Sequence, residues 1–134
     1  MNLVITPVPE EKFSTIYYLD SEKQTENIPE TVVLGENSTF SLWLGVENHN
    51  ATTLYYSVQV KYDDGKSPVD PSPAKPTQTF EKRLANGERW EFPVTVNIDQ
   101  PGSNRVIFEL WYLNGTSLEP EYTGNWVNIS VEAV

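Results

Sequence analysis

His49 is the only histidine of the chain and the residue best suited to act as a general base or metal ligand. A metal site needs several converging ligands and a general base needs an oriented partner, so we expect His49 to be a turn residue that hydrogen-bonds its neighbours. Carboxylate pairs such as Glu88 with Glu91, or Glu119 with Glu121, could serve glycoside hydrolysis, but no motif of a nucleophile, metalloprotease or phosphate-binding loop accompanies them. The sequence therefore predicts no catalytic residue, no cofactor and no enzyme activity.

Three aspartates, Asp63, Asp64 and Asp70, lie around a segment rich in glycine and proline. Carboxylate oxygens are ligands that Ca²⁺ prefers, yet this spacing does not fit the EF-hand pattern, in which alternating ligands precede a glycine. We therefore expect a solvated acidic loop and assign no metal ligand to it.

The four tryptophans offer another kind of chemistry, because an exposed indole face can stack on a sugar ring. Trp43 and Trp111 alternate away from the apolar stripes of their segments and are the candidates for sugar stacking; Trp126 shares this pattern. In the competing interpretation the tryptophans pair across strands or cover a sheet face beneath a loop, since aromatic pairs stabilise sheets.

The acceptor pattern for N-glycosylation, Asn-x-Ser/Thr, occurs at four asparagines. Asn37, Asn50 and Asn114 fall in predicted turns, from which a glycan could project. Asn128 falls within a predicted strand and is the least suited of the four. The pattern favours an extracellular address.

Length and composition predict one domain over residues 1–134, with 38% hydrophobic residues and no cysteine. Stability must therefore come from packing and hydrogen bonds rather than from disulfides. The formal net charge of −10 disfavours nucleic acid and anionic lipid as partners, because both attract clustered Lys and Arg. The chain has no apolar run long enough to span a membrane, and its first residues lack the pattern of a signal peptide. We expect it to be a soluble segment excised from a longer protein.

Apolar and polar residues alternate with a period of two between turn residues, which predicts an all-β chain. The predicted strands cover residues 13–19, 31–34, 39–47, 56–62, 77–84, 89–98, 104–113 and 126–133. Seven or eight short strands of this kind are typical of an immunoglobulin-like β-sandwich of two antiparallel sheets. The apolar faces of 39–47 and 56–62 are expected to meet in the core.

Two connections carry clear signals. Asn86-Gly87 lies between alternating segments and predicts a β-hairpin, because both residues tolerate positive φ. Four prolines between Ser67 and Pro76 exclude a helix and a central strand, so this segment is predicted to be a surface loop or an edge crossover.

Several short blocks follow one another in a characteristic order: Phe13–Leu19, Leu34-Gly35-Glu36, Gly45-Val-Glu-Asn-His-Asn50, Gly87-Glu-Arg-Trp-Glu91 and Trp126–Val131. Together they resemble the C-terminal part of an archaeal family of predicted membrane proteins, the domain-of-unknown-function family 1616. The resemblance spans nearly the whole chain, although Trp111-Tyr112 departs from the charged turn expected there. It implies a sandwich outside the membrane behind transmembrane helices that this chain lacks, and it implies no activity.

We therefore expect a non-catalytic structural or protein-interaction module on the extracellular face of an archaeal cell membrane, anchored through an N-terminal region absent from this chain. Its partner would be a protein or glycan of the cell envelope. The alternative is a carbohydrate-binding module that uses the exposed aromatic residues Trp43 and Trp111.

Overall fold

The computed structural model describes residues 12–113, 115–116 and 119–134. This part of the chain forms eight β-strands and confirms the all-β prediction. The strands are β1 (Phe13–Leu19), β2 (Thr31–Val32), β3 (Thr39–His49), β4 (Leu54–Asp63), β5 (Gln78–Leu84), β6 (Arg89–Asn97), β7 (Gly102–Leu113) and β8 (Pro120–Ala133). None of the described residues belongs to a helix that could span a bilayer.

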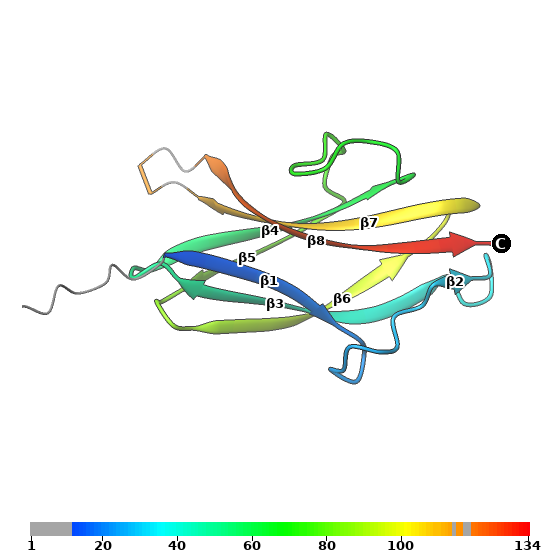
Figure 1. The fold of residues 1–134 in the computed structure, drawn as a ribbon, viewed down its shortest axis with the longest axis horizontal. Helices are drawn as coiled ribbons and strands as arrows, with labels where there is room; N and C mark the ends of the chain where they lie inside the picture. The colour runs from blue at the N-terminus through cyan, green and yellow to red at the C-terminus, as the bar shows by residue number, and fades with distance from the viewer. Residues whose placement is uncertain (1–11, 114, 117–118) are drawn as a thin grey trace, which may run out of the picture.

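The strands form two stacked sheets (Figure 1). One sheet has three strands in the order β1-β3-β6, and the other has five in the order β2-β8-β7-β4-β5. Neighbouring strands are antiparallel except for the short β2, which runs parallel to β8. The architecture is the predicted immunoglobulin-like sandwich.

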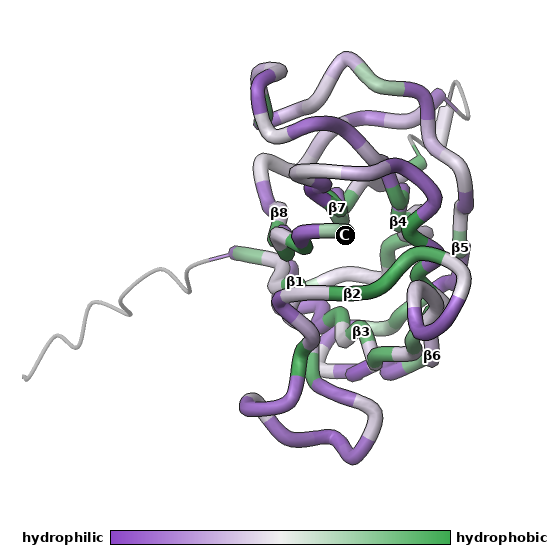
Figure 2. The backbone as a smooth tube through the Cα atoms, turned by 90° about the vertical axis from the view of Figure 1, so that its right-hand side faces the viewer, coloured by the Kyte–Doolittle hydropathy of each residue, from purple (hydrophilic) through white to green (hydrophobic). Residues whose placement is uncertain are grey.

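The core lies between the two sheets and is built from the predicted inward stripes. Leu42, Leu44 and Val46 of β3 are fully buried, and so are Val58 and Val60 of β4 in the opposite sheet. The apolar faces of these two strands therefore meet in the core, as predicted. Figure 2 shows hydrophobic residues concentrated in the strands, whereas the loops that project from the sandwich are mostly hydrophilic.

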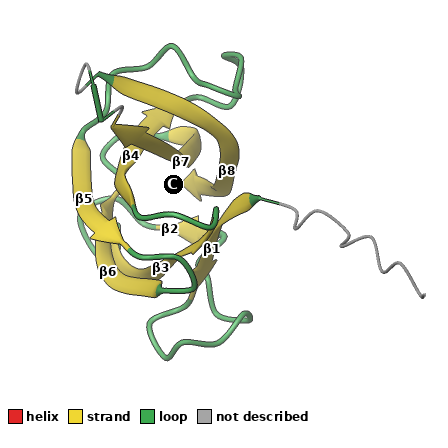
Figure 3. Cartoon of the chain, turned by 90° about the vertical axis from the view of Figure 1, so that its left-hand side faces the viewer, coloured by secondary structure: helices red, strands yellow, loops and turns green. Residues whose placement is uncertain are grey.

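The predicted hairpin at Asn86-Gly87 is wrong, although the turn itself forms with Gly87 at a φ of +86°. β5 pairs with β4 and β6 pairs with β3, so the turn carries the chain from one sheet to the other (Figure 3). Two amphipathic strands can bury their apolar faces by opposing each other across a core, and their sequences do not distinguish this arrangement from direct pairing.

β8 begins at Pro120, well before the predicted start at Trp126. The early part of β8 pairs with the end of β7 through a register irregularity between Leu110 and Trp111, and Gly124 adopts a φ of +86°. Such an irregularity breaks the period of two, which is the signal that would have identified the strand.

The loop between β4 and β5, residues 64–77, folds over the outer face of the five-stranded sheet (Figure 1). The Ser72 backbone N–H donates to Glu109 Oε2 at 2.6 Å, and the Ser72 carbonyl accepts from Lys61 Nζ at 2.8 Å. Beneath the loop, Lys61 Nζ lies 2.7 Å from Glu109 Oε1, and both side chains are buried. The predicted surface loop is therefore also the cover of one sheet.

Candidate functional site: the outer face of the three-stranded sheet

The outer face of the three-stranded sheet carries a connected set of aromatic and charged side chains. They alternate with the core residues of β1, β3 and β6, and one more comes from the loop after β1. We call this set the aromatic–charged face: Phe13, Thr15, Tyr17, Lys23, Trp43, Glu47, His49, Arg89 and Glu91. Its side chains are exposed or half-buried, unlike those beneath loop 64–77.

Tyr17 lies at the centre of this face because Gly45 has no side chain. The two residues are directly opposite in the β1–β3 pair, and a Cβ on Gly45 would lie 2.0 Å from Cζ of Tyr17. The Tyr17 hydroxyl donates to Glu91 Oε2 at 2.7 Å. Partial burial, followed by the Glu91 carboxylate, raises the pKa of Tyr17 to about 12, so the phenol is protonated at neutral pH.

Trp43 lies beside Tyr17 on the same face, and Lys23 covers part of it. The Lys23 ammonium is 4.3 Å from the centroid of the indole and 3.5 Å from Glu91 Oε1. This arrangement is a cation–π contact combined with a partly exposed ion pair. A partner that binds this face could therefore contact the Trp43 indole, the Tyr17 phenol and the Arg89 guanidinium together.

Glu47 connects the remaining members of the face. Its carboxylate accepts a hydrogen bond from Arg89 Nε at 2.9 Å and lies 3.1 Å from His49 Nε2. The His49 hydrogen bond, together with Arg89, holds the pKa of the Glu47 carboxyl below its usual range. His49 ends β3, and its ring stacks on Phe13 with 4.6 Å between centroids. Its contacts are therefore with neighbours on the sheet surface.

Trp111 lies on the outer face of the other sheet, so the two candidate sugar-stacking tryptophans do not share a surface. The Trp111 indole N–H donates to Glu109 Oε1 at 3.0 Å, and the ring packs against Tyr122 with 5.1 Å between centroids. Lys61 Nζ is 5.6 Å from the centroid of the indole. This is the cross-strand packing beside a covering loop that the competing interpretation describes.

The three aspartates of the predicted acidic loop do not converge. Asp63 accepts two hydrogen bonds from Arg105, at 2.8 and 2.7 Å; although burial alone would raise the pKa of Asp63, Arg105 holds it below the usual value. Asp64 accepts from the Lys66 backbone N–H instead. Among the described residues no three His, Cys, Asp or Glu side chains come together as metal ligands would.

The predicted glycosylation sites differ in how accessible their amides are. Asn37 is exposed in the turn before β3, with its Oδ1 accepting from the Val33 backbone N–H. Asn50 is half-buried, and its Nδ2, the atom to which a glycan would attach, donates within the fold to Phe13 O at 3.0 Å. Asn114 lies outside the described residues. Glycosylation of these residues remains a prediction.

Asn48 is a structural residue that the sequence reasoning missed. It is fully buried, and its Nδ2 donates to the carbonyls of Thr52 at 2.8 Å and Leu84 at 2.9 Å. It thereby joins the β3–β4 turn to the end of β5. The sequence signal that could have identified Asn48 is its position in β3, where it continues the inward-facing series of Leu42, Leu44 and Val46.

A protein-family model, described as "Domain of unknown function (DUF1616)", matches residues 7–127. No curated protein matches the sequence.

Solved structures contain similar sandwiches. The crystal structure of the CARDB domain of the PF1109 protein from Pyrococcus furiosus, in complex with di-metal ions, has a TM-score of 0.60 at 13% identity, covering 100% of this chain and 95% of that one. Its solution structure has a TM-score of 0.61 at 13% identity, covering 94% and 98%. A β-glucosidase from Listeria innocua has a TM-score of 0.58 at 16% identity over 91% of this chain. The chain spans only 16% of that β-glucosidase. These likenesses show the fold.

Proposed function

Because this chain belongs to the DUF1616 family of domains of unknown function, and because its fold is a CARDB-like sandwich, we propose that it is a non-catalytic module that binds another protein. The aromatic–charged face is the proposed binding surface. The observation that carries the proposal is the difference between the two sheets: loop 64–77 covers the outer face of one, whereas Tyr17, Trp43 and Arg89 remain accessible on the other.

The composition of the aromatic–charged face supports a protein partner. Tyr, Trp and Arg are the residue types that contribute most to protein interfaces, because each combines a large contact area with a polar or charged group. Here all three lie on neighbouring strands of one sheet. Phe13, which is 47% exposed, extends the apolar area at the start of β1.

The charge distribution also supports this surface. Lys23 and Arg89 balance Glu47 and Glu91, so the face is close to neutral in a chain with a net charge of −10. A second protein could therefore approach this face with less repulsion than elsewhere. The two ion pairs would be desolvated on binding, which makes them determinants of specificity more than of affinity.

We further propose that the module lies outside an archaeal cell, carried by a parent protein with membrane-spanning helices. The sequence resemblance to predicted membrane proteins and the four glycosylation patterns support this address. Proteolysis of intact cells tests it: an antibody against the domain should lose its signal when protease is added outside. Protection until the cells are lysed would overturn the proposed address.

Photo-crosslinking tests the binding surface. A photoreactive phenylalanine analogue at position 17 should crosslink the domain to one envelope protein, and the purified partner should then bind the wild-type domain in solution. The control carries the same analogue at position 79, an exposed residue of edge strand β5. Trp43→Ala should weaken binding of the purified partner by at least about tenfold, as expected for an interface hot spot. Equal crosslinking from both positions, or unchanged binding by Trp43→Ala, would refute the assignment.

A further inference from the structure

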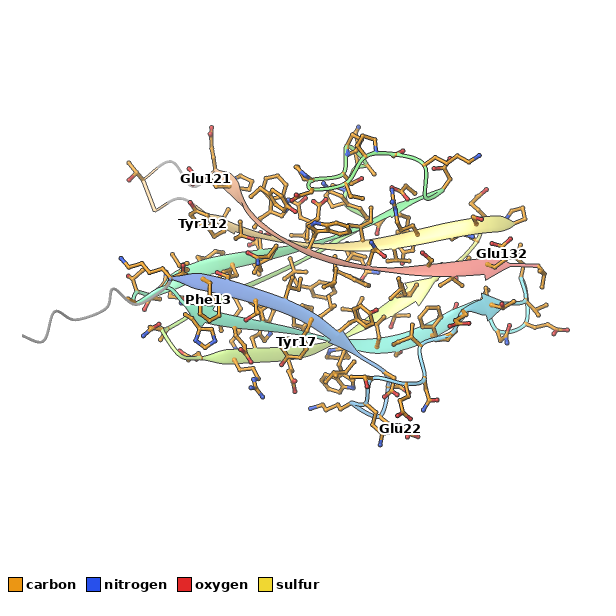
Figure 4. The ribbon with its side chains drawn as sticks, viewed as in Figure 1. Phe13, Tyr17, Glu22, Tyr112, Glu121 and Glu132 are labelled. Carbon is orange, nitrogen blue, oxygen red and sulfur yellow. The ribbon has the colours of Figure 1, made fainter. Side chains whose placement is uncertain are left out.

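A groove of about 620 Å³ opens at the end of the sandwich where β1 begins. It lies between the two sheets, and its walls come from the start of β1, the β3–β4 turn, the end of β7 and the early part of β8. Its aromatic side chains are Phe13, Tyr112 and Tyr122, and its amides are Asn50 and Asn125. Figure 4 shows Phe13 and Tyr112 at this same end of the molecule. The volume falls within the range of small-molecule sites.

The lining of this groove is almost free of charge. Of the described residues that form it, Lys12 alone carries a full charge, although 21% of the chain is charged. The others are aromatic, aliphatic, hydroxyl or amide side chains. A cationic ligand would find no counter-charge here and an anionic ligand would find Lys12 alone, so the chemistry favours a neutral ligand that forms hydrogen bonds.

The inner end of the groove is a buried cluster of hydroxyl and amide groups. Ser14 Oγ lies 2.6 Å from the Tyr56 hydroxyl, and Asn50 Nδ2 lies 2.8 Å from Ser14 Oγ. Asn50 Nδ2 also donates to the backbone carbonyl of Phe13 at 3.0 Å and to the side-chain Oδ1 of Asn48 at 3.1 Å, which fixes the orientation of the amide.

The cluster contains two hydroxyl groups in direct contact with each other. Ser14 and Tyr56 each carry one hydroxyl hydrogen, and the contact between them uses only one of the two. Because Asn50 presents its donor side to both oxygens, it offers no acceptor for the other hydrogen. A ligand oxygen in the groove could accept the second hydroxyl hydrogen.

We propose that this groove binds a neutral saccharide. Sugar hydroxyls both donate and accept, so they match a lining of amides and hydroxyls, and the C–H faces of a sugar ring match exposed aromatic surface. The half-buried Tyr112 is the main stacking residue, and its own hydroxyl is held by Glu121. Asn125 supplies a second amide to the lining. The groove shares Phe13 with the aromatic–charged face and none of its other members.

Calorimetric titration of the whole 134-residue chain tests this proposal. Cellotetraose, mannotetraose and N-acetylchitotetraose serve as neutral probes, and tetragalacturonate serves as the charged comparison. We expect at least one neutral probe to bind with a Kd of about 1 mM or tighter. In a ¹⁵N-labelled sample the side-chain amide signals of Asn50 and Asn125 should shift on binding, and tetragalacturonate should bind more weakly than the neutral probe.

Two matched variants on one strand locate the site. Asn125→Asp keeps the side-chain shape but places a charge in the groove, and should weaken binding at least about tenfold. Asn128→Asp makes the same chemical change on β8 outside the groove and should leave the Kd within about twofold. Urea unfolding of both variants verifies that each is folded.

Three outcomes would overturn the proposal. In the first, no neutral probe binds at about 10 mM, ten times the expected upper limit of the Kd. In the second, Asn125→Asp binds as tightly as the wild type while Trp43→Ala does not, which would move the saccharide to the aromatic–charged face. In the third, no saccharide binds but a peptide with the sequence of β1 does, which would mean that this end of the molecule binds an additional β-strand.

Discussion

Replacing Lys61 by Met should destabilise the domain by about 3–5 kcal/mol, the usual cost of removing one partner of a buried ion pair. The pair is well buried: the Lys61 side chain is 5% exposed, Glu109 is 0% exposed, and the two charged atoms are 2.7 Å apart. Methionine fills a similar volume, so little of the loss would come from a cavity. Most of it would come from the Glu109 carboxylate, which would remain buried without a cation.

The remaining partners of Glu109 limit the loss. Its carboxylate keeps the hydrogen bonds from the Ser72 backbone N–H at 2.6 Å and the Trp111 indole N–H at 3.0 Å. Bonds to a charged group contribute about 1.5–3 kcal/mol each, so the carboxylate retains part of its solvation and the expected value lies near the lower end of the range. Since domains of this size are stable by about 5–15 kcal/mol, the variant should still fold.

Urea unfolding at neutral pH, followed by tryptophan fluorescence, measures the effect. The matched control is Lys23→Met, which breaks the exposed 3.5 Å pair with Glu91 and should cost less than about 1 kcal/mol. In the double variant Lys61→Met/Glu109→Gln, neither charge is left unpaired, so its cost should fall below the sum of the two single costs. A loss below about 1 kcal/mol for Lys61→Met would refute the reasoning, because the pair would then behave as if it were in water.

Three further predictions concern stability. Gly45→Ala should cost about 1–3 kcal/mol because the new methyl group displaces the Tyr17 ring; urea unfolding in a Tyr17→Ala background should show almost no cost, and an equal cost there would contradict the explanation. Asn48→Ala should cost about 3 kcal/mol in the same assay, because the backbone carbonyls of Thr52 and Leu84 lose their buried donor. A cost below about 1 kcal/mol would mean that water replaces this donor. A hydrogen bond from the backbone N–H of Gln24 lowers the pKa of Asp20 in the folded state. The ionised Asp20 carboxylate therefore stabilises the fold above the unfolded-state pKa of 3.8, and this stabilisation is lost as the pH falls through the folded-state pKa. The unfolding free energy of Asp20→Asn should therefore fall less steeply on acidification than that of the wild type, and parallel curves would exclude this role.

The sequence predicts the inner surfaces of the sandwich well, because burial of one side of a strand imposes a period of two. Leu42, Leu44 and Val46 are buried as their alternation predicts. Alternation does not specify the sheet that a strand joins, however, because an amphipathic strand buries the same side in either sheet. Asn86-Gly87 between two alternating segments therefore predicts a hairpin, whereas the turn links the two sheets.

The buried ion pair and the residues of the candidate site were harder to predict because they depend on contacts between distant segments. Lys61 and Glu109 occupy outward positions, where charged residues are normally solvated; they are buried only because loop 64–77 folds back over them. Likewise, the position of Tyr17 over Gly45 depends on the register between β1 and β3. Trp43 is a candidate binding residue from its outward position in the sequence pattern alone, because that position can be read without knowing its neighbours in the fold.

The turns that pass between the sheets also bear on how the chain folds. β3 pairs with β6 across residues 50–88, and β4 pairs with β7 across residues 64–101, so neither sheet can form from one continuous stretch of chain. Pairing between strands so far apart in the sequence gives this topology a high contact order. Because each loop closure costs chain entropy before its pairing energy is gained, we expect slow folding, in the range of milliseconds to seconds. Both sheets should therefore appear together in a single cooperative step. A fragment that ends after β4, or one that begins at β5, would contain parts of both sheets and should remain unfolded.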